Sequence, residues 1–277
     1  MNYILITGAS SGIGRCSATY LAQKGLKIIA GVRKEEDFLA LKEEHENITP
    51  IYLDVLKKES LSTAFETLKE KNIELSAIIN NAGAVIAQPI EFINIDDLRY
   101  QFELNTIAPV AVAQTFLPLM KKGKIINLSS MASTGIFPFI SPYCASKRAL
   151  DILFNSLELE MQNKDIKVVS IKPGVIKTPI WNKSIDKNKE HLEKLPETFR
   201  EKYGKTLLCL ADNAQKNNFK GSEPISVAKT IYKVITIDNP KYSYCVGLDS
   251  LLVCDIAKLP HVLLNKLIMF NLKRKLK

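Results

Sequence analysis

The chain has 277 residues, of which 46% are hydrophobic and 24% are charged. That is enough apolar material for one large core, so we expect a single domain over residues 1–277 and exclude a disordered chain. Lysine and arginine exceed aspartate and glutamate by 9, but they are scattered except at the C-terminus, so we expect a solvated surface that favours a polyphosphate cofactor and no nucleic-acid partner.

The five cysteines are far apart and include no Cys-x-x-Cys pair. We therefore expect reduced thiols in a cytoplasmic compartment and no metal site. The apolar run at 3–6 leads directly into a glycine-rich turn, which leaves no room for a signal peptide. No apolar stretch reaches the length of about 18 residues that a bilayer span needs.

Short runs rich in Ile and Val alternate with segments of helical period along the chain. The runs predict strands at about 2–6, 27–32, 48–53, 76–80, 124–129, 167–172 and 242–246. The segments between them predict helices at 12–24, 35–44, 59–71, 96–121 and 141–163, with another beginning at Pro224. Because most strands are apolar at successive positions, both faces of the sheet must be covered. The fold class predicted is therefore α/β, a Rossmann-like doubly wound parallel sheet.

A Gly-x-x-x-Gly-x-Gly pattern lies where the first strand must turn into the first helix. Glycine lets the backbone turn sharply and approach a pyrophosphate, whose charge is met by the N–H groups and dipole of the helix N-terminus. The serines can add hydroxyl contacts. The candidate cofactor-binding residues here are Gly8, Ser10, Ser11, Gly12, Ile13 and Gly14.

The second strand ends in Arg33 and Lys34. An acid at this place binds the free ribose 2′-hydroxyl of NAD, whereas a base can pair with the 2′-phosphate of NADP. We therefore predict NADP(H) in preference to NAD(H), with Arg33 as the main contact; the alternative is a solvent-exposed basic pair. Asp54 and Val55 follow the third strand, and Asn81, Ala82 and Gly83 follow the fourth, at the strand ends where such folds bind ligands.

Tyr143 and Lys147 are four residues apart in a predicted helix, so they share one face. A phenol titrates near pH 10, and a neighbouring ammonium is expected to bring its pKa toward neutrality, where it could act as an acid or base. The preceding strand ends in Ser129 and Ser130. Adjacent strand residues point to opposite faces, so only one of the two serines is expected to face Tyr143.

These motifs, in this order over about residues 3–180, resemble the short-chain dehydrogenase/reductase family, in particular its hydroxysteroid and retinol dehydrogenase-like branch. The resemblance implies a catalytic set of Asn105, Ser130, Tyr143 and Lys147. Tyr143 would exchange a proton with the substrate oxygen, and Ser130 would hydrogen-bond that oxygen. Lys147 would tune Tyr143 and hold the nicotinamide ribose, and Asn105 would anchor a water of a proton relay.

The resemblance also implies that the loop after the sixth strand grips the nicotinamide carboxamide, through Pro173, Gly174, Val175 and Thr178. Residues 179–222 would form a substrate lid, and Phe137 and Phe139 would bind substrate beside Ser130 and Tyr143. A basic amphipathic tail at about 255–277 could contact a membrane surface, a second subunit or the substrate cleft. A homodimer or homotetramer would form through the helices at 96–121 and 141–163.

The function expected is thus an NADP(H)-dependent alcohol dehydrogenase or carbonyl reductase with a hydrophobic steroid-, retinoid- or lipid-like substrate. The alternative is a catalytically idle dinucleotide-binding redox sensor or scaffold. A complete set of Asn105, Ser130, Tyr143 and Lys147 argues against the alternative, because binding alone does not need Lys147 one turn from Tyr143. A sugar-nucleotide epimerase is disfavoured because little chain remains for a substrate domain.

Overall fold

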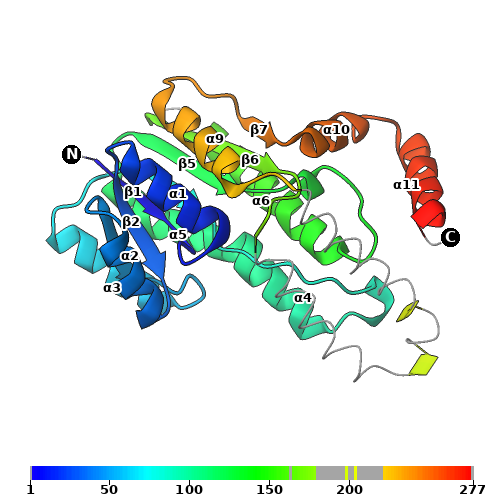
Figure 1. The fold of residues 1–277 in the computed structure, drawn as a ribbon, viewed down its shortest axis with the longest axis horizontal. Helices are drawn as coiled ribbons and strands as arrows, with labels where there is room; N and C mark the ends of the chain where they lie inside the picture. The colour runs from blue at the N-terminus through cyan, green and yellow to red at the C-terminus, as the bar shows by residue number, and fades with distance from the viewer. Residues whose placement is uncertain (1, 162–163, 179–196, 199–202, 205–220, 276–277) are drawn as a thin grey trace.

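The computed structural model describes residues 2–161, 164–178, 197–198, 203–204 and 221–275. Within them, seven parallel strands form one sheet in the order β3-β2-β1-β4-β5-β6-β7 (Figure 1). The strands are β1 (Tyr3–Ile6), β2 (Lys27–Val32), β3 (Ile48–Tyr52), β4 (Leu75–Asn80), β5 (Gly123–Leu128), β6 (Ile166–Pro173) and β7 (Ser243–Val246). Their ends differ from the predicted ones by no more than one residue.

Helices cover both faces of the sheet, as the two-sided apolar strands require. One core lies under α1 (Gly12–Gln23), α2 (Glu35–Glu44) and α9 (Pro224–Thr236). A second core lies on the other face, under α3 (Lys58–Glu70), α5 (Ala108–Phe116) and α6 (Ser141–Glu160). The predicted Rossmann-like doubly wound fold is confirmed.

The strand order places a topological switch point between β1 and β4. From β1 the chain adds β2 and β3 on one side, then returns to place β4 on the other side of β1. Connections at the carboxyl ends of β1 and β4 therefore diverge, and ligands of open α/β sheets bind in the crevice that this leaves. The glycine turn, the residues singled out after β3, β4, β5 and β6, and Tyr143 and Lys147 lie at this edge of the sheet.

The predicted helix at 96–121 is not one regular helix. It consists of α4 (Ile95–Phe102), a π-helical turn (Glu103–Ile107), α5 and a final 3-10 turn (Leu117–Leu119). Pro109 lacks the N–H that an α-helix would direct at the carbonyl of Asn105, four residues earlier, so the regular hydrogen-bond ladder cannot continue there. The irregular turn carries Asn105, and π-turns are frequent at functional sites.

The predicted helix at 141–163 also ends earlier, at Glu160, and residues 162–163 lie outside the described part of the chain. After β7 the chain continues as α10 (Leu248–Ile256), which packs against β7, and then as α11 (His261–Lys275), which extends away from the sheet (Figure 1). Among the described residues, no helix combines the length and the apolar character needed to cross a bilayer.

Candidate active site

The glycine turn between β1 and α1 is fixed by the loop after β4. Gly8 and Gly12 have φ of 64° and 57°, in the left-handed region that favours glycine. The Asn81 side-chain amide donates to the carbonyls of Thr7 and Gly8, each at 2.9 Å. A Cβ on Gly14 would lie 2.4 Å from that amide nitrogen. The turn is therefore closely packed on its inner side, and only glycine fits at position 14.

The N-terminus of α1 suits an anion. No side chain caps its first N–H groups, and its first turn contains no acidic residue. Free N–H groups and the positive end of the helix dipole therefore face the cleft without a competing carboxylate. The glycine turn and this helix end together fit the pyrophosphate of a dinucleotide.

A cleft of about 290 Å³ runs along the carboxyl ends of the strands from this turn to Tyr143. All predicted cofactor-binding residues except Gly14 line it: Gly8, Ser10, Ser11, Gly12, Ile13, Arg33, Asp54, Val55, Asn81, Ala82, Gly83, Tyr143, Lys147, Pro173, Gly174, Val175 and Thr178. Gly14 lies behind the turn, where it allows the contact with Asn81.

Arg33 and Lys34 differ in their surroundings. Arg33 lines the cleft at the end of β2, and among the described residues no ion pair holds its guanidinium. The Lys34 ammonium pairs with the Glu36 carboxylate at 2.8 Å on the exposed surface, and Lys34 is not part of the cleft wall. Of the two, Arg33 is the cation placed to meet an anionic group in the cleft.

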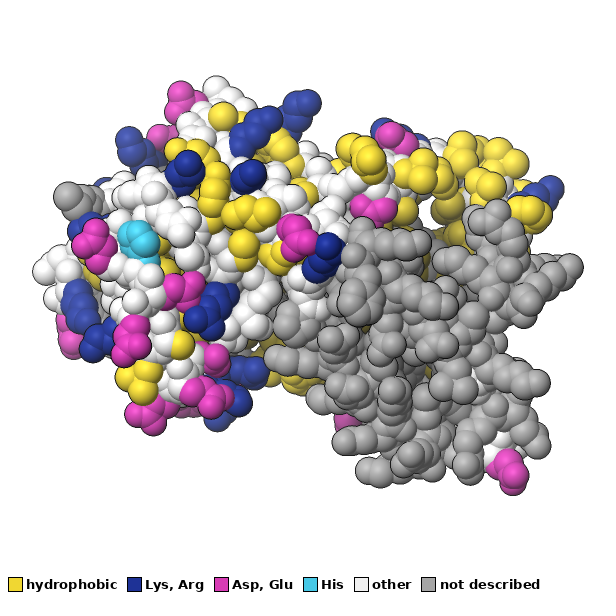
Figure 2. Space-filling model, viewed as in Figure 1, with side chains coloured by type: hydrophobic (Ala, Val, Ile, Leu, Met, Phe, Trp, Pro, Cys, Tyr) yellow, Lys and Arg dark blue, Asp and Glu magenta, His cyan; other side chains and the backbone are white. Residues whose placement is uncertain are grey.

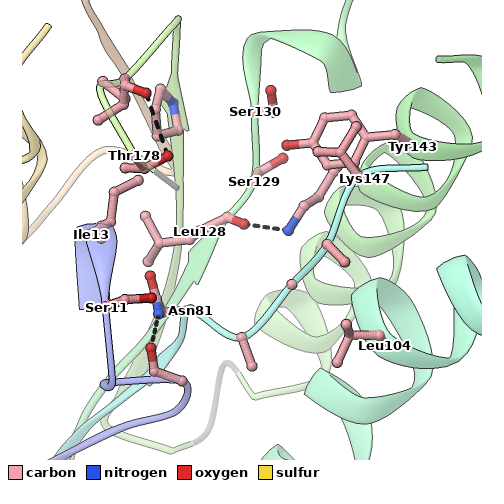
Figure 3. Close-up of a pocket in the computed structure, with 18 of the residues that line it drawn as sticks. Ser11, Ile13, Asn81, Leu104, Leu128, Ser129, Ser130, Tyr143, Lys147 and Thr178 are labelled. Carbon is pink, nitrogen blue, oxygen red and sulfur yellow. Dashed lines mark hydrogen bonds between the residues drawn. The ribbon is translucent and has the colours of Figure 1, made fainter. Parts of the chain in front are cut away.

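Tyr143 and Lys147 are on successive turns of α6 and both face the end of β5 (Figure 3). The Lys147 ammonium donates to the Leu128 carbonyl at 2.7 Å. The Ser130 side chain acts on the Tyr143 hydroxyl and lowers the pKa of the phenol. Ser130 Oγ in turn accepts the N–H of Ala132 at 3.1 Å, capping a 3-10 turn (Met131–Ser133). The structure thus brings Ser130, Tyr143 and Lys147 together at one end of the cleft.

The pKa of Tyr143 differs from the sequence prediction. Burial raises it to about 12, and the hydrogen bond with Ser130 opposes that rise. Burial lowers the pKa of Lys147 to about 8, opposed by the carboxylate of Asp151 one turn further along α6. The prediction that Lys147 moves the pKa of the phenol toward neutrality is wrong, because loss of hydration is the larger effect on both groups.

Asn105 lies behind the cleft wall and is fully buried. Its side-chain oxygen accepts the N–H of Ala84 at 3.0 Å, and its amide donates to the Ala84 carbonyl at 2.9 Å and to Ser146 Oγ at 3.2 Å. A Cβ on Gly83 would lie 3.2 Å from the Asn105 oxygen and 3.5 Å from the Lys147 ammonium. Asn105 thus holds the loop after β4 beside Lys147; its role in a water relay stays a prediction.

The loop after β6 is held by residues that sequence reasoning missed. The Gly174 N–H donates to the Val246 carbonyl at 2.8 Å, and the Val175 N–H donates to the Asp249 carboxylate at 2.6 Å. A Cβ on Gly174 would collide with the same carboxylate. Asp249 is 74 residues beyond Val175, so no local signal could have revealed the contact.

The substrate end of the cleft has a mainly apolar wall. Phe137 lines it, as predicted, and so do residues without a sequence motif, among them Val85, Leu104, Ile140 and Ile176. Phe139 does not line it: this residue has φ of 69°, and its ring contacts Tyr203 at 6.0 Å between centroids. Ser129 also lines the cleft; its buried hydroxyl has no hydrogen-bond partner among the described residues. The predicted lid, 179–222, lies mostly outside the described residues.

The site and the fold define an oxidoreductase of the dinucleotide-binding class, and comparison with known proteins gives the family. Residues 2–189 match the family model for short chain dehydrogenases. The chain is 34% identical over 194 residues to an NADPH-dependent 3-dehydrocapnine reductase of Ornithobacterium rhinotracheale, covering 66% of this chain and 69% of the relative. It is 28% identical to human 17-beta-hydroxysteroid dehydrogenase type 6, covering 90% and 81%.

Solved structures share the fold. A short chain dehydrogenase from Burkholderia cenocepacia in complex with NADP has a TM-score of 0.74 at 20% identity, with 96% of this chain and 97% of that chain covered. One from Burkholderia phymatum in complex with NAD has a TM-score of 0.77 at 20% identity, with 92% of both chains covered. The chain belongs to the short-chain dehydrogenase/reductase family.

Proposed function

We propose that the protein transfers a hydride between NADP(H) and an alcohol/carbonyl pair, with Tyr143 as the group that exchanges a proton with the substrate oxygen. The observation that carries the proposal is the arrangement of Ser130, Tyr143 and Lys147 at one end of a cleft whose other end is an uncapped helix N-terminus. A bound nicotinamide would supply or accept the hydride. The protein's own residues would donate or accept the proton.

Each catalytic side chain has a definable task in this proposal. A phenol with a pKa of about 12 is protonated at neutral pH, so Tyr143 can donate to a carbonyl oxygen during reduction. Because Ser130 Oγ accepts the Ala132 N–H, its own proton is available for the same oxygen. The Lys147 ammonium would hold the nicotinamide ribose hydroxyls, and Asn105 would anchor the water relay.

The proposed reaction is tested by measuring enzymatic turnover. We expect reduced nicotinamide cofactor to be oxidised in the presence of some member of a panel of apolar ketones and aldehydes, followed by its absorbance. Tyr143→Phe keeps the ring and removes the proton, and we expect it to lower kcat by about 10²- to 10⁴-fold. Tight NADPH binding, seen by fluorescence titration, without turnover of any carbonyl or alcohol would instead support the idle sensor or scaffold.

We propose NADP(H) as the preferred cofactor, with Arg33 on its 2′-phosphate. Support comes from the position of Arg33 in the cleft wall and from a relative named NADPH-dependent; solved structures of the fold hold either NADP or NAD.

Arg33→Ala should weaken NADPH binding about 10- to 100-fold and leave NADH binding nearly unchanged, because it removes a charge-assisted hydrogen bond. Lys34→Ala is the matched control, since Lys34 is paired with Glu36. Equal losses for both cofactors would overturn the assignment.

We propose a hydrophobic substrate of steroid-, retinoid- or lipid-like character. The apolar wall supports it, with Val85, Leu104, Phe137 and Ile140 around the end that holds Tyr143. The relative named as a 17-beta-hydroxysteroid dehydrogenase supports the same class. Residues 179–222 are proposed as the lid over this end. The test uses a panel of carbonyl compounds of increasing apolar area. We expect kcat/KM to rise with that area.

We propose that the protein is cytoplasmic and that its tail, 255–277, touches a membrane surface. Hydrophobic side chains gather over α10 and α11 (Figure 2); in α11 they include Val262, Leu267 and Phe270, which are 66%, 41% and 65% exposed. The chain ends in a basic cluster of Lys273, Arg274, Lys275 and Lys277, which favours anionic lipid. Cosedimentation with phosphatidylserine vesicles but not with phosphatidylcholine vesicles is expected. Absence of binding to both would leave the tail to a second subunit or the substrate cleft.

A further inference from the structure

Two cysteines of the described chain meet beside the cleft. Cys245 is on β7 and Cys254 is on α10, and their sulfur atoms are 3.1 Å apart. Both are free thiols and half-buried. A disulfide needs a sulfur–sulfur distance of about 2.05 Å, so a shift of about 1 Å would join them.

The pair lies between the two loops that build the active site. Cys245 is the register partner of Lys172 in β6, directly before Pro173 and Gly174. On the other side, the Cys254 sulfur is 3.6 Å from the Thr134 hydroxyl, in the loop that follows Ser130. A covalent bond here would fasten α10, which also carries Asp249, to the sheet.

We propose that Cys245 and Cys254 form a modification site: a dithiol that oxidised thiol compounds convert reversibly into an intramolecular disulfide. With oxidised glutathione, the Cys254 thiolate attacks one glutathione sulfur and releases one glutathione thiolate. Cys245 then loses its proton and attacks the Cys254 sulfur, releasing the second glutathione. Two protein thiols and one glutathione disulfide thus become one protein disulfide and two glutathione thiols.

The order of attack follows from the surroundings of Cys245. Burial raises the pKa of its thiol, and the neighbouring Cys254 sulfur acts in the same direction. The Cys245 thiol donates its hydrogen bond to the Cys254 sulfur, and the thiolate is the attacking species, so we assign the first attack to Cys254 and the second to Cys245, the resolving cysteine. No sequence motif indicated this pair, because the two cysteines are nine positions apart and the packing of α10 against β7 brings them together.

The experiment is peptide mapping of the full chain after equilibration in buffers of reduced and oxidised glutathione, followed by alkylation of free thiols. As the buffer becomes more oxidising, we expect the alkylated peptides of Cys245 and Cys254 to disappear together and one disulfide-linked peptide to appear. Reduction with dithiothreitol should restore both alkylated peptides. Cys16 and Cys144 should stay alkylatable after unfolding, because burial raises the pKa of both thiols.

Two single variants sharpen the result. In Cys245→Ser the remaining Cys254 should stop at the mixed disulfide with glutathione, whereas Cys254→Ser should leave Cys245 largely unmodified. Cys16→Ser, a matched change in α1, should form the linked species as the natural chain does. A link from either cysteine to another position, or independent glutathionylation of both in the natural chain, overturns the proposal. The thiol readout needs no turnover, so it is independent of the proposed reaction.

Discussion

Tyr143 and Lys147 are buried deeply enough that the direction of the pH dependence can be derived. Reduction needs the phenol proton, which a pKa of about 12 retains throughout the neutral range. It also needs the Lys147 ammonium, whose pKa of about 8 means that the charge is lost as the pH rises through that value. We therefore predict that kcat/KM for carbonyl reduction is level below about pH 7 and falls above about pH 8, approaching about tenfold per pH unit.

The measurement is a pH series of kcat/KM for one carbonyl substrate with NADPH, since this ratio reports the enzyme form that binds the carbonyl compound. Lys147→Arg keeps the positive charge at all these pH values. Any activity it retains should therefore lack the fall near pH 8. A level profile for the natural chain up to pH 9.5, or the same fall in the arginine variant, contradicts the assignment to Lys147.

Ser129 and Ser130 are a natural matched pair at the end of β5. Both are buried in the cleft wall, but Ser130 is the one whose side chain lowers the pKa of Tyr143. Ser130→Ala should lower kcat by about 10²- to 10³-fold, the usual cost of removing one donor to a developing oxyanion. Ser129→Ala should change kcat far less, because its hydroxyl has no partner among the described residues. Thermal unfolding checks that both variants fold; a reversed ranking would assign the role to Ser129.

Some of the predicted residues had a local signature, whereas Asn105 and Ser130 were predicted from the resemblance to the family. Tyr143 and Lys147 share a helix face, and Gly8, Gly12 and Gly14 mark one turn, so spacing alone indicated that each group would meet. The pKa of Tyr143 could not be predicted this way, because it depends on how deeply the completed fold buries the phenol. The contact between Cys245 and Cys254 could not be predicted either, because it forms only when α10 packs against β7.

At the scale of elements, α10 supports the loop that follows β6. The Asp249 carboxylate accepts the Val175 N–H and fills the space above Gly174. Asp249→Ala would leave a partly buried N–H unpaired, which costs about 1–3 kcal/mol. We predict that the Kd for NADPH rises about 5- to 100-fold and that Asp249→Asn, which keeps an acceptor oxygen, loses less.

Fluorescence titration with NADPH measures this effect directly. Asp255→Ala is the matched control, because Asp255 is on the same helix but pairs with Lys258 on the exposed surface. It should bind NADPH as the natural chain does. If Asp249→Ala also keeps the natural affinity, the loop does not depend on α10.

Element boundaries were predicted well where apolar runs were compact and less well where prolines interrupt helices. The strand ends were correct to within one residue, because buried parallel strands must be apolar throughout. The helix at 96–121 was wrong in its interior: the periodic pattern continues through the π-turn (Glu103–Ile107), although Pro109 breaks the ladder at Asn105. The hydrophobic period of a segment indicates which face of the helix is buried. It does not indicate which N–H group each backbone carbonyl accepts.

For the whole molecule, a parallel sheet covered on both faces followed from the alternation of strands and helices, whereas the strand order was not predicted. The oligomeric state of the chain does not follow from the pattern of strands and helices. The two helical segments proposed as the subunit interface leave large apolar side chains uncovered in one copy of the chain: Ile107, Ile152, Leu153 and Leu159 are 51%, 55%, 47% and 67% exposed. Uncovered apolar side chains on neighbouring elements are typical of association surfaces.

We therefore predict that the chain is a homodimer or homotetramer and that Ile152→Glu converts it to a smaller species. In a two-fold interface each residue is used twice, so one substitution buries two unpaired charges and is costly. Leu39→Glu is the matched control, because Leu39 is 52% exposed but lies on α2, under the other face of the sheet. Sedimentation velocity should give the natural mass for Leu39→Glu and a reduced mass for Ile152→Glu. A monomeric natural chain, or an unchanged mass for Ile152→Glu, would show that α6 is not the interface and would favour α10 and α11, whose apolar side chains are equally uncovered.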